Sequence, residues 1–219
     1  MLQHITLEQT LPLVFQGTGG EPPVAESQVW LRNLTLSREN SYLVTAESGT
    51  GKSSLCSFIY GIRTDYSGRI LFDGEDIRNL GTGQWCRLRR ESLAWLPQEM
   101  RLFPELTVME NIMIKNRLSD RYSEQEIRRM LQRLEIDNKA DTRAEFLSVG
   151  QQQRVAVIRA LAQPFDFIIL DEPVSHLDAR NNTAVAALVE ETASAQGAAI
   201  IVTSVGNHLS LHDPETIRL

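Results

Sequence analysis

A short apolar run, a glycine-rich loop and a helical pattern follow one another in YLVTAESGTGKSSLCSFIYG, residues 42–61. The first four residues include aromatic and β-branched side chains, which are typical of a buried strand. Leu55, Phe58 and Ile59 then recur at the spacing of one helix face, and Gly61 is suited to end that helix. A strand that passes through a glycine-rich turn into a helix predicts an α/β fold with a ligand-binding loop.

The loop between the strand and the helix has the residue types that bind phosphate. Its glycines let successive backbone N–H groups turn toward one anion, Lys52 supplies a full positive charge, and the Ser53 hydroxyl is a suitable Mg²⁺ ligand. Ala46 stands where the general pattern has glycine, and it would be strained if that position required a positive φ. The predicted nucleotide-binding residues of this loop are Ala46, Glu47, Ser48, Gly49, Thr50, Gly51, Lys52, Ser53 and Ser54.

Two acidic residues end a second apolar run, FIILDEP at residues 167–173. A continuous apolar run is typical of a parallel strand covered on both faces, and such sheets bind ligands beyond the carboxyl ends of their strands. Asp171 is predicted to hold Mg²⁺ through water, and Glu172 to orient or deprotonate the water that attacks a γ-phosphate. The pair predicts nucleotide hydrolysis beside the phosphate loop.

Composition limits the classes of protein that the chain can be. Its 219 residues fit one domain, and 22 Lys+Arg against 28 Asp+Glu give a net charge of −6, so we expect no nucleic-acid partner. Cys56 and Cys86 have no metal-binding spacing and suit a reducing compartment. No apolar stretch approaches the roughly 18 residues that cross a bilayer, and the first residues do not resemble a signal peptide. We therefore expect a cytoplasmic protein that reaches a membrane only through a partner.

The remaining patterns indicate strands at both ends of the chain and helices between them. Strands are expected within residues 29–36, 42–46 and 68–77, with a hairpin turn at Asp73-Gly74, and loop over residues 16–23. Helices are expected over 107–162, where Thr107 with Glu110 and Ser123 with Glu126 have the spacing of capping boxes. Pro164 ends that block, and AAIIVTS at 198–204 is a further strand after a helix that Gly197 ends. The chain is therefore predicted to be one domain, with its core in residues 1–84 and 165–219 and a helical insertion in 85–164.

The segment LSVGQQQRVAVIRAL, residues 147–161, identifies a family. Ser148 has Gln151 three residues later and precedes a helical pattern, so it is predicted to cap a helix whose free N–H groups face an anion. The segment closely resembles the signature of ATP-binding cassette (ABC) ATPases, LSGGQ followed by QQRVAIARAL. The resemblance implies a head-to-tail dimer with two shared ATP sites. In it, the signature residues Ser148, Val149, Gly150 and Gln151 face the ATP of the other subunit, and Val149 replaces a glycine of the family.

Other landmarks of that family follow in the expected order. Residues 93–112 resemble the Q-loop, which implies that Gln98 reaches Mg²⁺ and the attacking water. The exposed apolar cluster expected at Leu102, Phe103 and Leu106 would then touch a membrane partner. SHLD, residues 175–178, is similar to the D-loop, which brings His176 and Asp178 to the dimer interface. The implied fold is a P-loop NTPase core: a mostly parallel sheet flanked by helices, with an N-terminal antiparallel β part and an inserted helical subdomain.

Two further departures from the family accompany Val149. Ser204 stands where the family has a switch histidine that contacts the γ-phosphate. His208 would lie one turn away if a helix began at Ser204, but we favour His176 as the substitute, because in the family's dimer the D-loop lies close to the partner's switch segment. No aromatic residue occurs in EPPVAESQ, residues 21–28, where the family has the side chain that stacks on adenine. Phe15 is the nearest candidate upstream, whereas Trp30 is better suited to the core.

The resemblance implies an ATP-binding and ATP-hydrolysing cassette subunit that uses ATP and Mg²⁺. It would form a homodimer or heterodimer and power an integral membrane subunit from the inner face of the cytoplasmic membrane. The segment RAEFLSVGQQQR, residues 143–154, is similar to the importer, lipoprotein-release and cell-division branches. An ATP-gated binding module with little hydrolysis stays open, because Ser204 replaces the switch histidine. A P-loop kinase would share the first loop but does not explain LSVGQ or Gln98.

Overall fold

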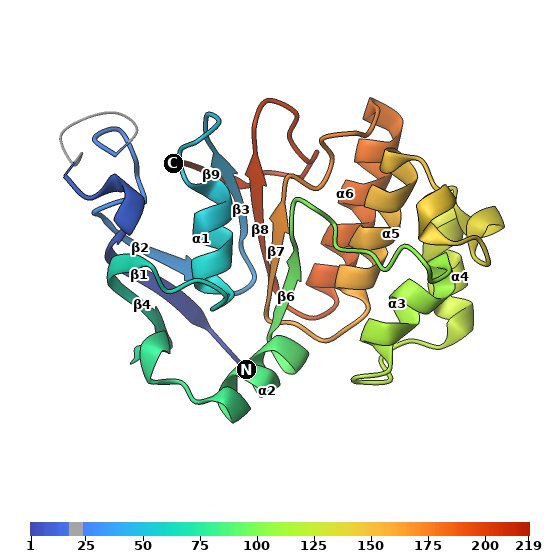
Figure 1. Ribbon diagram of the computed structural model, residues 1–219, viewed down its shortest axis with the longest axis horizontal. Coiled ribbons are helices and arrows are strands. Elements are labelled where there is room, and N and C mark those ends of the chain that lie inside the picture. The colour runs from blue at the N-terminus through green and yellow to red at the C-terminus, as the bar shows by residue number, and fades with distance from the viewer. Residues whose placement is uncertain (18–23) are drawn as a thin grey trace.

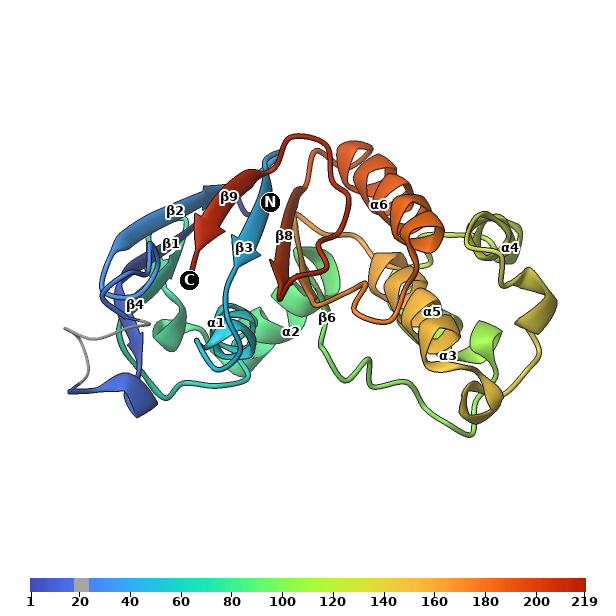
Figure 2. The same cartoon turned by 90° about the horizontal axis from the view of Figure 1, so that it is seen from above.

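Two β-sheets and a group of helices make up the chain, and the computed structural model describes residues 1–17 and 24–219. The antiparallel sheet lies at one side, the parallel sheet in the middle and helices α3 to α6 at the other side (Figure 1). Seen from above, helix α1 lies between the two sheets (Figure 2). This is the α/β arrangement predicted for a P-loop NTPase core with an antiparallel part.

The N-terminal part of the chain builds an antiparallel sheet in the order β2-β1-β4-β5. Its strands are β1 (His4–Pro12), β2 (Asn33–Ser37), β4 (Tyr66–Phe72) and β5 (Glu75–Asp76). Asp73 and Gly74 form the predicted hairpin turn, with φ of 48° and 87°, and β4 pairs with β5 across it. The strand expected over residues 29–36 was placed too early, because Trp30 is fully buried beside the phosphate loop and does not pair in a sheet. Most of the loop expected at 16–23 lies outside the described residues.

The second sheet is parallel throughout, in the order β6-β7-β8-β3-β9. Its strands are β3 (Ser41–Thr45), β6 (Leu93–Leu96), β7 (Phe167–Asp171), β8 (Ala199–Ser204) and β9 (Glu215–Arg218). Every residue of β7 and β8 is buried, as expected for strands covered on both faces. Ile168 and Leu170 pack with α3 to α6, whereas Phe167 and Ile169 pack with α1 and the antiparallel sheet. The sheet thus separates two hydrophobic clusters.

The helices are α1 (Lys52–Ile59), α2 (Thr82–Glu91), α3 (Val108–Asn116), α4 (Glu124–Arg133), α5 (Val149–Leu161) and α6 (Ala179–Ser194). The predicted capping boxes are confirmed at Thr107, Ser123 and Ser148. Of the described helices, none is both long and apolar enough to cross a bilayer. The division of the chain at residues 84 and 164 stays a prediction. The first of these boundaries falls inside α2, and β6 from the predicted insertion pairs with β7 in the central sheet.

A single buried amide holds the segment that follows Gln98. The Asn111 side chain is fully buried in α3; it accepts a hydrogen bond from the Phe103 N–H at 2.8 Å. It also donates to the carbonyl oxygens of Phe103, Leu106 and Thr107 at 3.0–3.2 Å. These contacts fix the backbone of residues 103–107 against the helical part of the chain.

We expect Asn111→Ala to lower the free energy of unfolding by about 1–3 kcal/mol, because buried backbone groups lose their partners. Urea denaturation followed by circular dichroism measures the change. The exposed Asn138 provides the control, and Asn138→Ala should alter stability by less than about 0.5 kcal/mol. Equal stability of the two variants would show that residues 103–107 hold their conformation without the amide.

Candidate functional site

The loop from Ala46 to Gly51 joins the end of β3 to the start of α1, as the sequence predicts. Gly49 and Gly51 have φ of 84° and 99°, in the left-handed region that favours glycine. Ala46 is not among the described residues with a positive φ, so the strain considered for it does not arise. The loop therefore keeps its turn with alanine at the first position.

The cationic and hydroxyl groups of the loop are held close to its backbone. Lys52 is only 6% exposed, and its ammonium donates to the Glu47 carbonyl oxygen at 2.9 Å. The Thr50 hydroxyl donates to the same carbonyl at 3.0 Å. In the part of the chain that the structure describes, no side chain caps α1, so the N–H groups of its first turn stay available to an anion. Ser53 is exposed, whereas the Ser54 hydroxyl already accepts a hydrogen bond from Arg63 at 2.9 Å.

Asp171 and Glu172 emerge beside this loop, at the carboxyl end of β7. Asp171 is buried and accepts a hydrogen bond from the Thr203 hydroxyl at 2.5 Å. Glu172 is half-buried, with φ of 50°, and Gln98 donates to its Oε2 at 3.3 Å. A left-handed backbone in a non-glycine residue is uncommon and is characteristic of functional positions. The predicted water-activating acid and the Q-loop glutamine are thus brought together from positions 74 residues apart.

The thiol of Cys56 belongs to the packing behind this acidic edge. Burial raises the pKa of Cys56 well above its ordinary value, and the negative charge of Asp171 raises it further. The thiol therefore stays protonated and acts as a small core group next to the acid.

Helix α5 is tied to the loop after β7 by a residue that the sequence analysis did not single out. Gln153 is 2% exposed; its amide donates to the Glu172 carbonyl at 3.0 Å and to the Ser175 hydroxyl at 3.2 Å. It also accepts from the His176 N–H at 3.1 Å. The signal was present in the run QQQR, where a third glutamine follows the signature. Through Gln153, the signature helix and the predicted catalytic acid are held in one network.

The signature residues stand at the start of α5. Ser148 accepts from the Gln151 N–H at 3.3 Å, and the Gln151 side chain accepts from the Ser148 N–H at 3.0 Å. A Cβ at Gly150 would lie 3.1 Å from the His176 carbonyl oxygen, so a side chain there would crowd the D-loop. Val149 is 47% exposed and adds an apolar surface without disturbing the core. Contacts of these residues with a second subunit remain a prediction.

The region around the missing switch histidine differs from the expectation. No helix begins at Ser204; the chain leaves β8 through bends, yet His208 Nδ1 lies 2.9 Å from the Ser204 hydroxyl. His176, which the sequence analysis favoured, instead has its Nδ1 2.9 Å from the Ser175 hydroxyl. Within one subunit, His208 is therefore the histidine beside Ser204. A role for His176 across a dimer stays a prediction.

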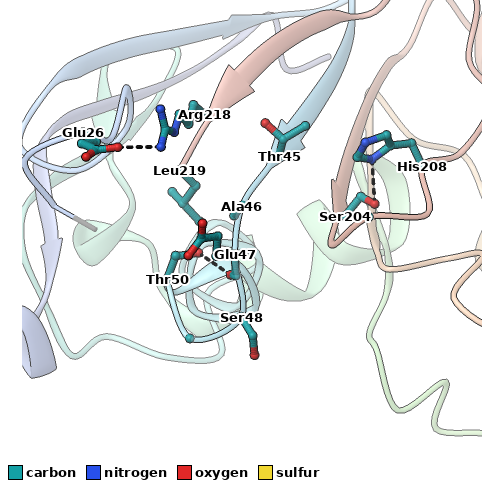
Figure 3. Close-up of a pocket in the computed structure, with 12 residues that line it drawn as sticks. Glu26, Thr45, Ala46, Glu47, Ser48, Thr50, Ser204, His208, Arg218 and Leu219 are labelled. Atoms are coloured by element: carbon teal, nitrogen blue, oxygen red, sulfur yellow. Dashed lines mark hydrogen bonds and ion pairs between the residues drawn. The ribbon is translucent and has the colours of Figure 1, made fainter. Parts of the chain in front are cut away.

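A cavity of about 680 Å³ connects the phosphate loop with this region (Figure 3). Thr45, Ser48 and Thr50 line it from the loop, and Ser204 and His208 line it from the segment after β8. Trp30 holds the Thr50 carbonyl of the loop: its indole N–H donates to that carbonyl at 2.9 Å. Trp30 is fully buried, which confirms its assignment to the core.

The aromatic side chains near the loop pack over Gly51. A Cβ at Gly51 would lie 3.0 Å from the Trp30 ring and 3.2 Å from the Phe15 ring, so the close approach requires glycine. Phe15 is half-buried against the same hydrophobic cluster as Trp30. The Phe15 ring therefore lies beside the loop and packs on Gly51. Adenine stacking by Phe15 stays a prediction.

The oxygen donors near the loop suit Mg²⁺. Ser53, Gln98 and Asp171 offer hydroxyl, amide and carboxylate oxygens, the hard ligands that Mg²⁺ prefers. No group of three or more His, Cys, Asp or Glu with metal-binding geometry occurs in residues 1–17 and 24–219. Such a small protein contribution fits an ion that completes its coordination with phosphate oxygens and water.

The expected apolar cluster after Gln98 is only partly exposed. Phe103 is 48% exposed, but Leu102 is half-buried and packs on the core, and Leu106 is also half-buried. The expectation of three exposed side chains was wrong for the two leucines: Leu102 packs on the core, and the Asn111 amide holds the Leu106 carbonyl against α3. Ile114 of α3 is 41% exposed.

Comparisons with known proteins agree with this geometry. The family model described as ABC transporter matches residues 32–175. An uncharacterized ABC transporter ATP-binding protein of Mycobacterium tuberculosis is 34% identical over 83% of this chain, which spans 56% of that protein. The lipoprotein-releasing system ATP-binding protein LolD of Shewanella frigidimarina is 30% identical, over 81% of this chain and 76% of its own length. A dimeric structure of a bacterial ABC transporter cassette matches with a TM-score of 0.75 and 24% identity, over 91% of this chain and 87% of that one. The chain belongs to the ABC transporter family.

Proposed function

We propose that this chain binds and hydrolyses ATP as the cassette subunit of a membrane transporter or a related membrane complex. The contact between Gln98 and Glu172, which directly follows Asp171 at the end of β7, is the observation that supports hydrolysis most directly. These side chains come from the segments that follow β6 and β7, at the carboxyl edge of the parallel sheet, where such sheets bind ligands. The family membership supports the same activity.

Each residue has a distinct task in this proposal. The loop N–H groups and Lys52 hold the phosphates, and Ser53 and Asp171 hold Mg²⁺, which neutralises charge on the transferring phosphoryl group. Gln98 orients the water, and Glu172 accepts its proton as the water oxygen bonds to the γ-phosphorus. The bond to the bridging oxygen of ADP then breaks, and ADP and phosphate leave.

A second subunit would complete the site. The capped start of α5, with Ser148 and Gly150, directs N–H groups outward and fits the γ-phosphate of an ATP on the partner. Asp178 caps α6 by accepting from the Asn181 N–H at 2.8 Å, and this backbone hydrogen bond lowers the pKa of Asp178. An ionised, fixed Asp178 suits the interface role proposed for the D-loop.

Steady-state release of phosphate by the purified chain with ATP and Mg²⁺ tests the hydrolysis proposal. We expect turnover that is slow in the isolated chain and rises when the membrane subunit is present. Tight ATP binding without phosphate release under either condition would favour the ATP-gated module instead.

A cluster of cations supports a docking site for the membrane subunit. Arg89, Lys115 and Arg159 are half-buried near one another, between the core and the helical part of the chain. Burial lowers the pKa of Lys115, and the charges of Arg159 and Arg89 lower it further. Within the described residues, none of the three lies within 4.0 Å of a carboxylate. Neighbouring positive charges without counter-ions favour an acidic segment on the partner.

Aromatic side chains continue this surface, and we call Arg89, Lys115 and Arg159 the cationic patch. Arg89 lies over the Tyr60 ring at 5.2 Å, and the Tyr60 and Trp95 rings are 5.0 Å apart. Arg159 donates to the carbonyls of Met100 and Arg101 in the segment after Gln98. A partner bound to the cationic patch would therefore touch the same segment that carries the proposed water-orienting residue.

Lys115→Glu is expected to abolish stimulation of ATPase activity by the membrane subunit and to leave basal activity unchanged. The new carboxylate would pair with Arg89 and Arg159, so thermal stability should stay equal or rise while acidic partners are repelled. ATPase assays with the membrane subunit reconstituted in nanodiscs measure stimulation. Lys139→Glu is the matched control, because it makes the same change of charge on a separate short 3-10 helix. Full stimulation of Lys115→Glu would contradict the docking site.

A further inference from the structure

His208 stands in a loop whose backbone is fixed from two sides. The Asn182 side chain of α6 donates to the His208 carbonyl at 2.7 Å and accepts from the Ser210 N–H at 3.0 Å. The neighbouring Asn207 donates to the Val174 carbonyl at 2.9 Å, after β7. Although the His208 side chain is exposed, the position of its backbone is therefore well defined.

The hydrogen bonds at Ser204 determine which nitrogen of His208 is free. The Ser204 hydroxyl lies 2.7 Å from the Asn207 carbonyl, which can only accept, so the single hydroxyl proton points there. Ser204 Oγ must then accept from His208, which places the ring proton on Nδ1. Among residues 1–17 and 24–219, no hydrogen-bond partner is found for His208 Nε2, which is left for a ligand.

The free nitrogen belongs to a residue that lines the same cavity as the phosphate loop (Figure 3). Ser204 ends β8 in register with Thr45 of β3, and the Ala46 N–H lies 3.4 Å from the Ser204 carbonyl. The charged residues that line the cavity are Glu26, Glu47 and Arg218, of which Arg218 is paired with Glu26. The ring thus stands across the cavity from the loop that would hold phosphates.

We propose that His208, oriented by Ser204, supplies the phosphate-facing imidazole that the chain lacks at position 204. The inference rests on the proposed function. With a proton on each ring nitrogen, Nδ1 still donates to Ser204 and Nε2 donates to a γ-phosphate oxygen. No proton leaves His208; its hydrogen bond stabilises the charge that develops as water adds to phosphorus and the bond to ADP breaks.

Amide substitutions separate the two nitrogens of the ring. His208→Ala should lower kcat by about 10²- to 10³-fold, the effect of removing one donor at a developing charge, with ATP affinity changed less than about threefold. Asparagine places a donor near Nδ1, whereas glutamine places one near Nε2. We therefore expect His208→Gln to retain part of the activity and His208→Asn to be as slow as His208→Ala.

A rescue variant tests whether an imidazole at this edge is what matters. The double variant, Ser204→His with His208→Ala, should have a kcat at least about tenfold higher than that of His208→Ala. This is expected although Ser204→His removes the hydrogen bond to Asn207. His212→Ala, an exposed histidine that does not line the cavity, is the control and should match the wild type. Phosphate-release kinetics and titration of a fluorescent ATP analogue provide kcat and affinity.

The outcomes distinguish this inference from the proposed function. A wild-type chain that binds ATP but never hydrolyses it, with or without its membrane subunit, overturns both. An active wild type together with an equally active His208→Ala overturns the role of His208 alone. Full activity of His208→Asn would show that the ring only supports Ser204, and it would also overturn the inference.

Discussion

Replacement of Glu172 by glutamine is expected to lower kcat for ATP hydrolysis by about 10²- to 10⁴-fold while ATP binding persists. Glutamine has nearly the same shape and can keep the contact with Gln98, but its amide cannot accept the proton of the attacking water. ATP that is bound and not cleaved should then hold two subunits together. Size-exclusion chromatography with light scattering, run with ATP and Mg²⁺, should show a dimer for Glu172→Gln.

A neighbouring acid provides the control for this variant. Glu99 follows Gln98 directly, is exposed and lies 3.8 Å from Arg101, so Glu99→Gln should hydrolyse ATP at the wild-type rate. Retention of most activity by Glu172→Gln would remove Glu172 as the base. A variant that is inactive yet monomeric with ATP would instead contradict the shared-site dimer.

Lys52→Ala is expected to weaken ATP binding by about 10- to 150-fold, because a hydrogen bond to a charged group contributes about 1.5–3 kcal/mol. The buried Lys52 ammonium donates to the Glu47 carbonyl, beside the space where the phosphates would lie. The substitution therefore removes a positive charge from that space. Isothermal titration calorimetry with ATP and Mg²⁺ measures the affinity.

A thermal melt of the same protein separates binding from folding, since the Glu47 carbonyl also loses a partner in Lys52→Ala. The surface residue Arg87 carries a control substitution, Arg87→Ala, which should bind ATP as the wild type does. Unchanged affinity of a folded Lys52→Ala protein would contradict the assignment of the loop to phosphate.

Local patterns in the sequence predicted the parts of the site that depend on neighbouring residues. The phosphate loop, the hairpin at Asp73-Gly74 and the caps at Thr107 and Ser148 each arise from residues within a few positions of one another. The strand ending in Asp171 was predicted for a similar reason, because continuous burial on both faces leaves a plain apolar run. The family resemblance then indicated which loops meet.

Features that depend on the path of the chain were not predictable in this way. His208 reaches Ser204 across a loop held by Asn182, and no local pattern reveals that amide as an anchor. β9 is a short, half-polar strand, and only its pairing with β3 defines it. The positive charges of Lys115 and Arg159 come together because α3 packs on α5, a contact that periodicity alone cannot predict.

The packing of Trp30 makes the phosphate loop visible to fluorescence spectroscopy. Its indole is excluded from water, bonds the Thr50 carbonyl and covers Gly51, so any movement of the loop changes the surroundings of this fluorophore. The other two of the chain's three tryptophans, Trp85 and Trp95, lie beside Arg89 and Arg101, where phenylalanine can replace them. A chain that keeps Trp30 as its single indole would therefore report occupancy of the loop through its own emission, without an attached dye.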